Sequence, residues 1–120
     1  MTAPNLKNPT TITGRTARVG IATTAVVGIL TNSAASNKVL KVNSIFAANV
    51  NGTVASDISV SIYDGSSDAY LAYTISVPPD ATQVISTKET YFYLEEGDSI
   101  RATSGTASAI NLVVGYEEIS

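Results

Sequence analysis

The sequence predicts an all-β fold, an antiparallel β-sandwich of the jelly-roll or immunoglobulin-like type with a short extended N-terminal arm. Beyond residue 10, β-branched residues are abundant and apolar and polar residues alternate with a period of two. No window keeps apolar residues at i, i+3, i+4 and i+7 over a helical length, and turn residues recur at short, even intervals. A chain of 120 residues supports one domain.

The first ten residues, MTAPNLKNPT, differ in character from the rest of the chain. They hold two prolines and show no hydrophobic periodicity, which is typical of an extended arm. Because no linker or repeat divides the remainder, we expect an arm over residues 1–10 and a single sandwich domain over residues 11–120.

Candidate strands follow the arm in a regular series, separated by turn residues. Each combines β-branched or aromatic residues with alternating polarity. They are ARVGI, AVVGIL, KVLKVNSIFAANV, SDISVSIYD, YLAYTISV, TQVIST, TYFYL, SIRAT and AINLVVGYEEI. Pro78 and Pro79 close the fifth of these, because proline cannot donate a ladder hydrogen bond. Eight to ten such strands favour two packed antiparallel sheets, and the strand order stays open.

Two pairs of neighbouring strands are predicted to form hairpins. Asn51-Gly52 separates residues 38–50 from 56–64, and Asn-Gly is the strongest short signal for a type I′ turn because both residues tolerate positive φ. The segment SGTAS similarly separates residues 99–103 from 109–119. Each flanking pair is therefore expected to lie side by side in one sheet.

Residue parity predicts which side chains face the core. In residues 38–50 the apolar positions of one parity are Leu40, Val42, Phe46 and Val50. In residues 56–64 they are Ile58, Val60 and Ile62, and in residues 70–77 they are Leu71, Tyr73, Ile75 and Val77. The set in residues 56–64 is expected to point inward, and the members of each of the other two sets are expected to share one face.

The composition excludes several classes of function. The chain has no His and no Cys, so Ser-His-Asp and Cys-His catalysis, histidine-bound zinc and thiolate sites are ruled out, and we expect neither an enzyme nor a cofactor. A net charge of -3 with scattered basic residues argues against nucleic acid. The apolar segment 19–30 is too short for a bilayer core of about 30 Å, so no membrane partner is expected.

Low charge is the most unusual feature of this composition. Only 14% of residues are charged and 44% are hydrophobic, whereas soluble domains carry about a quarter charged residues. Much of the surface must then be neutral. A neutral surface suits a subunit that is packed against protein neighbours.

The acidic segment YLEEGDSI, residues 93–100, raises the question of a metal or reactive site. Asp64, Gly65 and Asp68 form a second acidic loop, and calcium is the one metal worth weighing, since it binds loop carboxylates and carbonyls. Neither segment has EF-hand spacing. We favour a turn for residues 93–100, with Gly97 at positive φ and Asp98 bonding to the backbone. No metal site is predicted.

Six tyrosines stand out in so small a chain. Tyr91 and Tyr93 flank Phe92 in a strand, so they project from the face opposite Phe92. Tyrosine is enriched at protein interfaces because it combines large contact area with a polar end. A carbohydrate-binding face would use the same side chains, and this alternative stays open.

Three segments carry a resemblance to a known group of proteins. MTAPNLKNPTTITGRTA, KVLKVNSIFAANVNGT and YLEEGDSIRATSGTASAINLVVGYEEIS resemble small virion proteins of tailed bacteriophages, particularly marine and cyanobacterial ones. The resemblance covers most of the chain and rests on turn and strand patterns. It implies a β-sandwich structural protein located in the virion.

Within that group, the resemblance implies a capsid decoration, or cement, protein on the outer capsid surface. Such proteins often form trimers, so the resemblance implies a homo-oligomer, with a trimer favoured. They stabilise the shell by binding the major capsid protein or other virion proteins. The expected contacts are the arm and the tyrosine face, namely Thr2, Ala3, Pro4, Asn5, Leu6, Tyr91 and Tyr93. A structural role in the tail, neck or fibre attachment and a carbohydrate-binding module are the alternatives.

Overall fold

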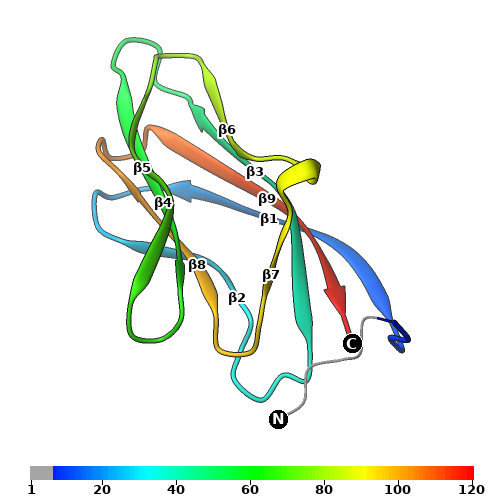
Figure 1. The fold of residues 1–120 in the computed structure, drawn as a ribbon. Helices are drawn as coiled ribbons and strands as arrows, with labels where there is room; N and C mark the ends of the chain where they lie inside the picture. Colours follow the sequence, from blue (N-terminus) through cyan, green and yellow to red (C-terminus); the bar gives the residue numbers. More distant parts are fainter. Residues whose placement is uncertain (1–6) are drawn as a thin grey trace.

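The protein is an all-β sandwich of two antiparallel sheets, as predicted (Figure 1). The structure is a computed structural model that describes residues 7–120; Thr2, Ala3, Pro4, Asn5 and Leu6 of the predicted arm lie outside the described residues. At the end of the predicted arm, the backbone N–H groups of Thr10 and Thr11 donate to the carbonyl of Ser120, over 2.6 and 2.8 Å.

The first sheet has five strands in the order β1-β9-β3-β6, with β7 also paired to β3. Its strands are β1 (Ile12–Ile21), β3 (Val39–Asn49), β6 (Thr82–Ser86), β7 (Phe92–Leu94) and β9 (Ile110–Ile119). A single 3-10 turn, η1 (Lys88–Thr90), connects β6 to β7.

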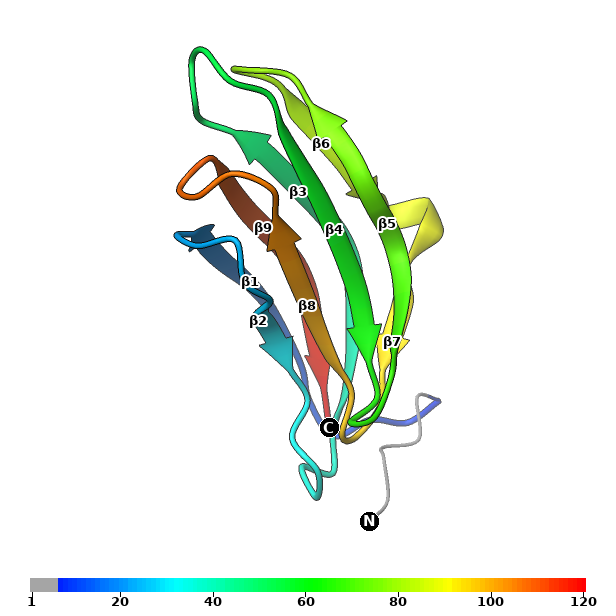
Figure 2. The same ribbon diagram turned by 90° about the vertical axis from the view of Figure 1, so that its left-hand side faces the viewer.

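The second sheet has four strands in the order β2-β8-β4-β5. Its strands are β2 (Val27–Thr31), β4 (Ser56–Tyr63), β5 (Asp68–Val77) and β8 (Ser99–Ser104). Figure 2 shows this sheet in front, with the five-stranded sheet behind it and the strands of both curving the same way. The two inner faces enclose the core.

This strand order is that of a jelly roll. β1-β9-β3-β6 faces β2-β8-β4-β5, so the chain changes sheets at most connections and stays in one sheet only between β4 and β5 and between β6 and β7. The immunoglobulin-like alternative is thereby set aside. Every strand pair is antiparallel, and long-range pairing dominates the fold.

Both predicted hairpins are wrong for this reason. β3 and β4, which flank Asn51-Gly52, belong to different sheets, and so do β8 and β9. Neither Asn51 nor Gly52 has positive φ. Instead, the Asn51 carboxamide oxygen accepts hydrogen bonds from the backbone N–H groups of Thr53 and Val54, at 2.9 and 3.0 Å. The Asn-Gly pair therefore forms an Asx-type turn that carries the chain across to the other sheet.

β-Bulges also overturn two parity predictions. The register of β3 against β9 shifts between Val42 and Ser44, so the inward parity changes along the strand. Beyond the shift Ile45 is buried, whereas Phe46 is 39% exposed and Val50, just past the strand, is 53% exposed. Parity placed these last two residues on the same face as Val42, which is buried.

The same correction applies to β5. Its register against β4 shifts twice, between Ile58 and Val60 and between Val60 and Ser61, and Thr74 has φ of 47°. Val77 faces the core, but Tyr73, predicted to lie on the same face, is exposed. The irregular backbone leaves Leu71 and Tyr73 exposed and buries Ala72 between them.

The core lies between the sheets and is built from aliphatic side chains. The largest fully buried apolar residues, at less than 2% exposure, are Ile21, Val42, Ile45, Ile58, Val60, Val77, Leu94, Ile100, Ile110, Leu112 and Val114. Phe92 and Tyr116 pack at the margin of this cluster. Ile58 and Val60 confirm the parity predicted for residues 56–64.

A buried asparagine holds the loops at each end of the sandwich. Asn32 follows β2, and its amide nitrogen donates to the carbonyls of Lys38 and Leu94, at 2.9 and 3.0 Å. At the other end, Asn49 donates to the carbonyls of Val54 and Val77, both at 2.9 Å. Each asparagine thus satisfies two carbonyls that the sheets leave unpaired.

Candidate interaction surfaces

The outer face of the five-stranded sheet carries a row of exposed apolar side chains. Phe46 of β3 lies opposite Val113 of β9 and Val84 of β6. Their exposed fractions are 39%, 37% and 43%. Because the three residues are in register on adjacent strands, they form one contiguous apolar ridge across the sheet.

The two predicted interface tyrosines lie on this same face. Tyr93 of β7 is opposite Lys41 of β3, and Tyr91 lies directly before β7. Their rings meet edge to face with centroids 5.8 Å apart, and the Lys41 amino group lies 4.4 Å from the Tyr91 ring centroid. Phe92 between them packs against the core, which agrees with the predicted orientation.

We call these five residues the outer patch: Phe46, Val84, Tyr91, Tyr93 and Val113. Phe46, Val84, Tyr93 and Val113 lie on β3, β6, β7 and β9 of the five-stranded sheet, and Tyr91 lies directly before β7. All five side chains are more than a third exposed. Contiguous exposed apolar side chains of this kind make the outer patch a candidate interaction site.

Charge around the outer patch is sparse and largely compensated. The Lys41 amino group lies 3.9 Å from the Glu117 carboxylate, and the amide of Asn43 donates to that carboxylate over 3.3 Å. Arg18 of β1 lies opposite Val113 at the end of the apolar row. Apart from the Arg18 guanidinium at this end, a partner placed on the patch would therefore meet little uncompensated charge to desolvate.

The outer face of the four-stranded sheet is different, because an ion pair lies across its strands. Arg101 of β8 donates two hydrogen bonds to Asp68 of β5, one of them from Nε over 3.2 Å. The guanidinium lies 3.7 Å from the centroid of the Tyr63 ring, and the Ser61 hydroxyl donates to Asp68 over 2.8 Å. Three adjacent strands are thereby joined by one cluster.

The electrostatics of this cluster follow from its hydrogen bonds. Those from Arg101, and then the one from Ser61, hold the pKa of the Asp68 carboxyl below its ordinary value. The bond to Asp68 in turn raises the pKa of Arg101. Both shifts favour the charged forms, so the ion pair is maintained and ties the neighbouring strands together.

Next to this cluster lies a second tyrosine pair. Tyr70 and Tyr73 of β5 are 55% and 65% exposed, and their rings meet edge to face with centroids 4.8 Å apart. Tyr70 lies opposite Ser61, which bonds Asp68. Exposed aromatic rings beside hydrogen-bonding groups form a surface that could bind a polar ligand.

The acidic segment 93–100 is a structural turn, as predicted. Gly97 has φ of 89°, and the Asp98 carboxylate accepts from the backbone N–H of Glu95 over 3.1 Å. The backbone of Gly97 also donates to the carbonyl of Asn32 over 2.8 Å, and Glu96 accepts from the N–H of Asn37 over 3.1 Å. The charged groups therefore hold two loops together at one end of the sandwich.

The second acidic loop is also occupied by its own hydrogen bonds. One Asp64 oxygen accepts from the N–H groups of Ser66 and Ser67, at 2.9 and 2.8 Å, and these bonds lower the pKa of Asp64. Asp68 is engaged with Arg101. Within residues 7–120, no three His, Cys, Asp or Glu side chains are grouped so that they could hold a metal ion.

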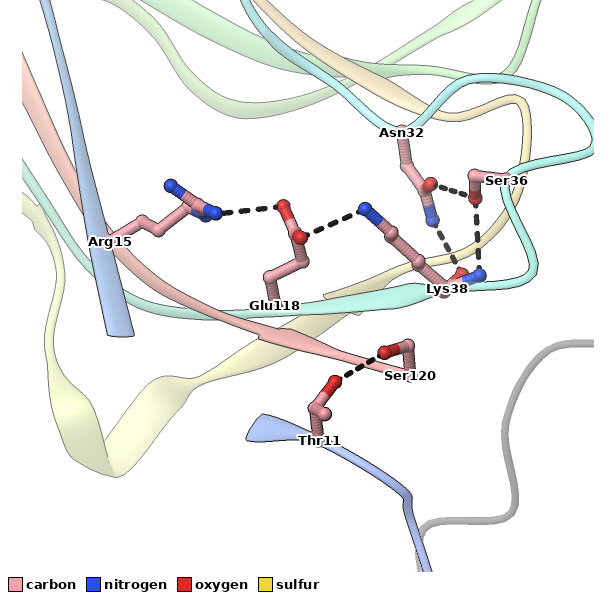
Figure 3. A network of polar contacts seen from close by, with 7 residues as sticks. All are labelled: Thr11, Arg15, Asn32, Ser36, Lys38, Glu118 and Ser120. Carbon is pink, nitrogen blue, oxygen red and sulfur yellow. Dashed lines mark hydrogen bonds and ion pairs between the residues drawn. The ribbon is translucent and has the colours of Figure 1, made fainter. Parts of the chain in front are cut away.

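A further polar network connects β9 to β1 and to Lys38, the residue directly before β3 (Figure 3). Glu118 of β9 lies between Lys38 and Arg15, with N–O distances of 2.9 and 3.3 Å. The hydrogen bond from Lys38 is the main cause that lowers the pKa of the Glu118 carboxyl. The side chains of Thr11 and Ser120 bond to each other nearby.

One shallow hollow lies beside β1 on the outer face of the five-stranded sheet. It encloses about 340 Å³ and is lined by Arg18, Val19, Gly20, Asn111, Leu112 and Val113. Gly20 opens this space, since a Cβ there would lie 3.1 Å from the Asn111 side-chain oxygen. The hollow borders the free edge of the sheet.

Comparison with known proteins identifies no relative: no family model and no curated protein matches this chain. No helix in the described part of the chain is long and apolar enough to cross a membrane. The proposed function therefore rests on the outer patch and the Tyr70–Tyr73 pair.

Sequence reasoning found part of the outer patch and missed the rest. Tyr91 and Tyr93 were predicted from strand parity, Phe46 was placed on the same face as Leu40 and Val42, which are buried, and Val84 and Val113 were not singled out. The one available signal was Asn43, a polar residue inside an apolar strand, where the bulge begins. Tyr70 and Tyr73 were noted only as part of the tyrosine content.

Proposed function

We propose that this protein is a structural protein of a virion that packs against protein neighbours through the outer patch. The single observation that carries the proposal is the apolar ridge of Phe46, Val84 and Val113, exposed on a sheet face with little charge. The low charge of the whole chain and the absence of His and Cys favour assembly over catalysis.

Within that class, the resemblance to phage virion proteins favours a capsid decoration protein. Its partners would be the major capsid protein or other virion proteins, together with further copies of itself. The jelly roll also occurs in viral capsid proteins, although that is an analogy of fold alone. A place in the tail, neck or fibre attachment uses the same surface and is the alternative within the virion.

Quantitative mass spectrometry of purified particles tests the location. A copy number close to that of the major capsid protein supports decoration, and a far smaller number supports the tail or neck. Absence of the chain from particles refutes both.

A pair of charge substitutions tests the surface. Phe46→Glu places a carboxylate in the centre of the ridge, and Tyr73→Glu places one on the opposite sheet, where the native ring is 65% exposed. Co-sedimentation with particles that lack the chain should be lost for Phe46→Glu and kept for Tyr73→Glu. Equal occupancy by the two variants would exclude the outer patch as the contact.

A carbohydrate-binding role is the second candidate, and the Tyr70–Tyr73 pair favours it. The rings are exposed beside the Asp68, Ser61 and Arg101 cluster, so a sugar could meet both aromatic and polar groups. A glycan array should then give a signal that Tyr73→Ala removes and Tyr91→Ala preserves. An array with no signal would set this candidate aside.

A further inference from the structure

β1 is a long edge strand with no partner on one side within residues 7–120. It runs for ten residues, pairs with β9 in an unbroken register, and lies at the margin of its sheet (Figure 2). The N–H and C=O groups along such an edge are a template for another strand.

The other edge strands are interrupted in ways that discourage pairing. β2 has five residues and a register shift between Gly28 and Leu30. β6 also has five residues, and its register against β3 shifts between Ile45 and Phe46. β5 is longer but has two shifts and the positive φ of Thr74. Bulges and short length are the usual protection of edges, and β1 has neither.

The register shows which backbone groups of β1 face outward. Thr11 and Ser120 exchange two hydrogen bonds, of 2.8 and 2.9 Å, so they are a hydrogen-bonded pair. Such pairs alternate along an antiparallel ladder, and the odd-numbered residues of β1 therefore bond to β9. The residues that direct N–H and C=O groups toward the free edge are Ile12, Gly14, Thr16, Arg18 and Gly20.

We propose that this edge pairs with the same edge of a second copy, antiparallel and centred on Thr16. A two-fold axis normal to the sheet keeps inner and outer faces aligned, so residues of equal parity oppose each other. Centring on Thr16 places Ile12 opposite Gly20 of the second copy and Gly14 opposite Arg18. All five outward-facing residues then find partners.

Neighbouring registers are less favourable. Centring on Arg15 would set two guanidinium groups directly opposite each other, which is destabilising. Centring on Ala17 would leave the outward groups of Ile12 without a strand partner, because β1 ends at Ile21. In the proposed register the two Thr16 side chains face each other, which is a favourable cross-strand pair.

Shape complementarity identifies a second copy as the occupant. Ile12 is 57% exposed on the outer side of β1, and the proposed register places it against Gly20, where the hollow of about 340 Å³ begins. The most exposed aliphatic side chain of the strand thus meets a hollow that adjoins Gly20. This pairing uses the edge of the sheet and is independent of the function proposed for the outer patch.

Cysteine cross-linking tests both the contact and its register, since the chain has no native Cys. In Thr16→Cys the two introduced residues would be a directly opposed hydrogen-bonded pair about 5.5 Å apart at Cα, within disulfide range. Arg18→Cys is the matched control, because its two copies would lie roughly 14 Å apart. Mild oxidation should yield a covalent dimer for Thr16→Cys alone. Similar yields for both variants, or none for Thr16→Cys, would overturn the register.

Sedimentation equilibrium of the full chain supplies the second test. Thr16→Pro removes an N–H that points away from β9, so the monomer should stay folded while two hydrogen bonds across the dimer are lost. We expect the dimer dissociation constant to rise about thirtyfold or more. A wild-type chain that stays monomeric, or a Thr16→Pro variant that dimerises equally well, would refute the proposal. The first of these results would point to a strand of a different protein as the occupant.

Discussion

Replacement of Asn32 by alanine is expected to destabilise the protein strongly, although no strand is altered. The side chain is 2% exposed, and its amide donates to the carbonyls of Lys38 and Leu94 while its oxygen accepts from the Ser36 hydroxyl. At about 1 kcal/mol for each net hydrogen bond, the loss is about 3 kcal/mol. The substitution also leaves two buried carbonyls without donors, so about 3 kcal/mol is a lower bound on the loss of stability.

Urea unfolding followed by circular dichroism measures the effect. With an m-value of about 2 kcal/mol/M, a loss of about 3 kcal/mol lowers the midpoint by about 1.5 M. Asn49→Ala removes the equivalent bonds at the other end of the sandwich, to Val54 and Val77, and should give a similar shift. Asn8→Ala changes an exposed residue and is the matched control, with an expected change of less than about 0.5 kcal/mol.

The double variant provides a sharper test of the reasoning. Asn32 and Asn49 lie at opposite ends and share no partner, so their effects should add to about 6 kcal/mol. That sum is comparable with the whole stability of a small domain, and the double variant should be largely unfolded without denaturant. A midpoint within about 0.3 M of wild type for either single variant would refute the role assigned to the buried carboxamides.

Two further predictions concern the turns and the charged cluster. Gly97→Ala should cost about 1 kcal/mol in thermal unfolding, because alanine is strained at φ of 89° while no atom lies within 4 Å of the added Cβ, and Glu95→Gln should change little. The pKa of Asp68 is lowered in the folded state, so its stabilising contribution is present above the ordinary value of 3.8 and is lost as pH falls below it. Asp68→Asn should therefore flatten the acid side of a plot of urea midpoint against pH, and an unchanged acid limb would contradict the cluster.

The fold class and the strand positions could be predicted from sequence because they depend on local pattern. The pattern located part of every strand, although β1 begins at Ile12, five residues before the predicted ARVGI, and turn chemistry placed Gly97 at positive φ, as the structure has it. Strand pairing could not be predicted in the same way. Asn51-Gly52 has the composition of a hairpin turn, yet the buried carboxamide of Asn49 holds the carbonyls of Val54 and Val77 and directs the chain to the other sheet. A contact between residues 28 positions apart leaves no local signal.

Side-chain direction failed where the backbone departs from strict alternation. One extra residue in β3, near Asn43, reverses the parity of everything beyond it, and similar shifts in β5 turn Tyr73 outward. The sequence therefore predicted only two residues of the outer patch, Tyr91 and Tyr93. Its two tyrosines lie on β7 or just before it, where alternation holds, and Phe46 lies beyond the bulge.

The bulge that hides Phe46 from sequence reasoning is also what creates the apolar ridge. With regular pairing, Phe46 would enter the core, which Ile45 and Ala47 now fill at 0% exposure. The shift between Val42 and Ser44 instead exposes a large aromatic side chain between Val84 and Val113 and buries Ile45 and Ala47 in its place. The exposed aromatic ridge on one face and the regular free edge of β1 are the two surfaces on which the proposed contacts with neighbouring proteins depend.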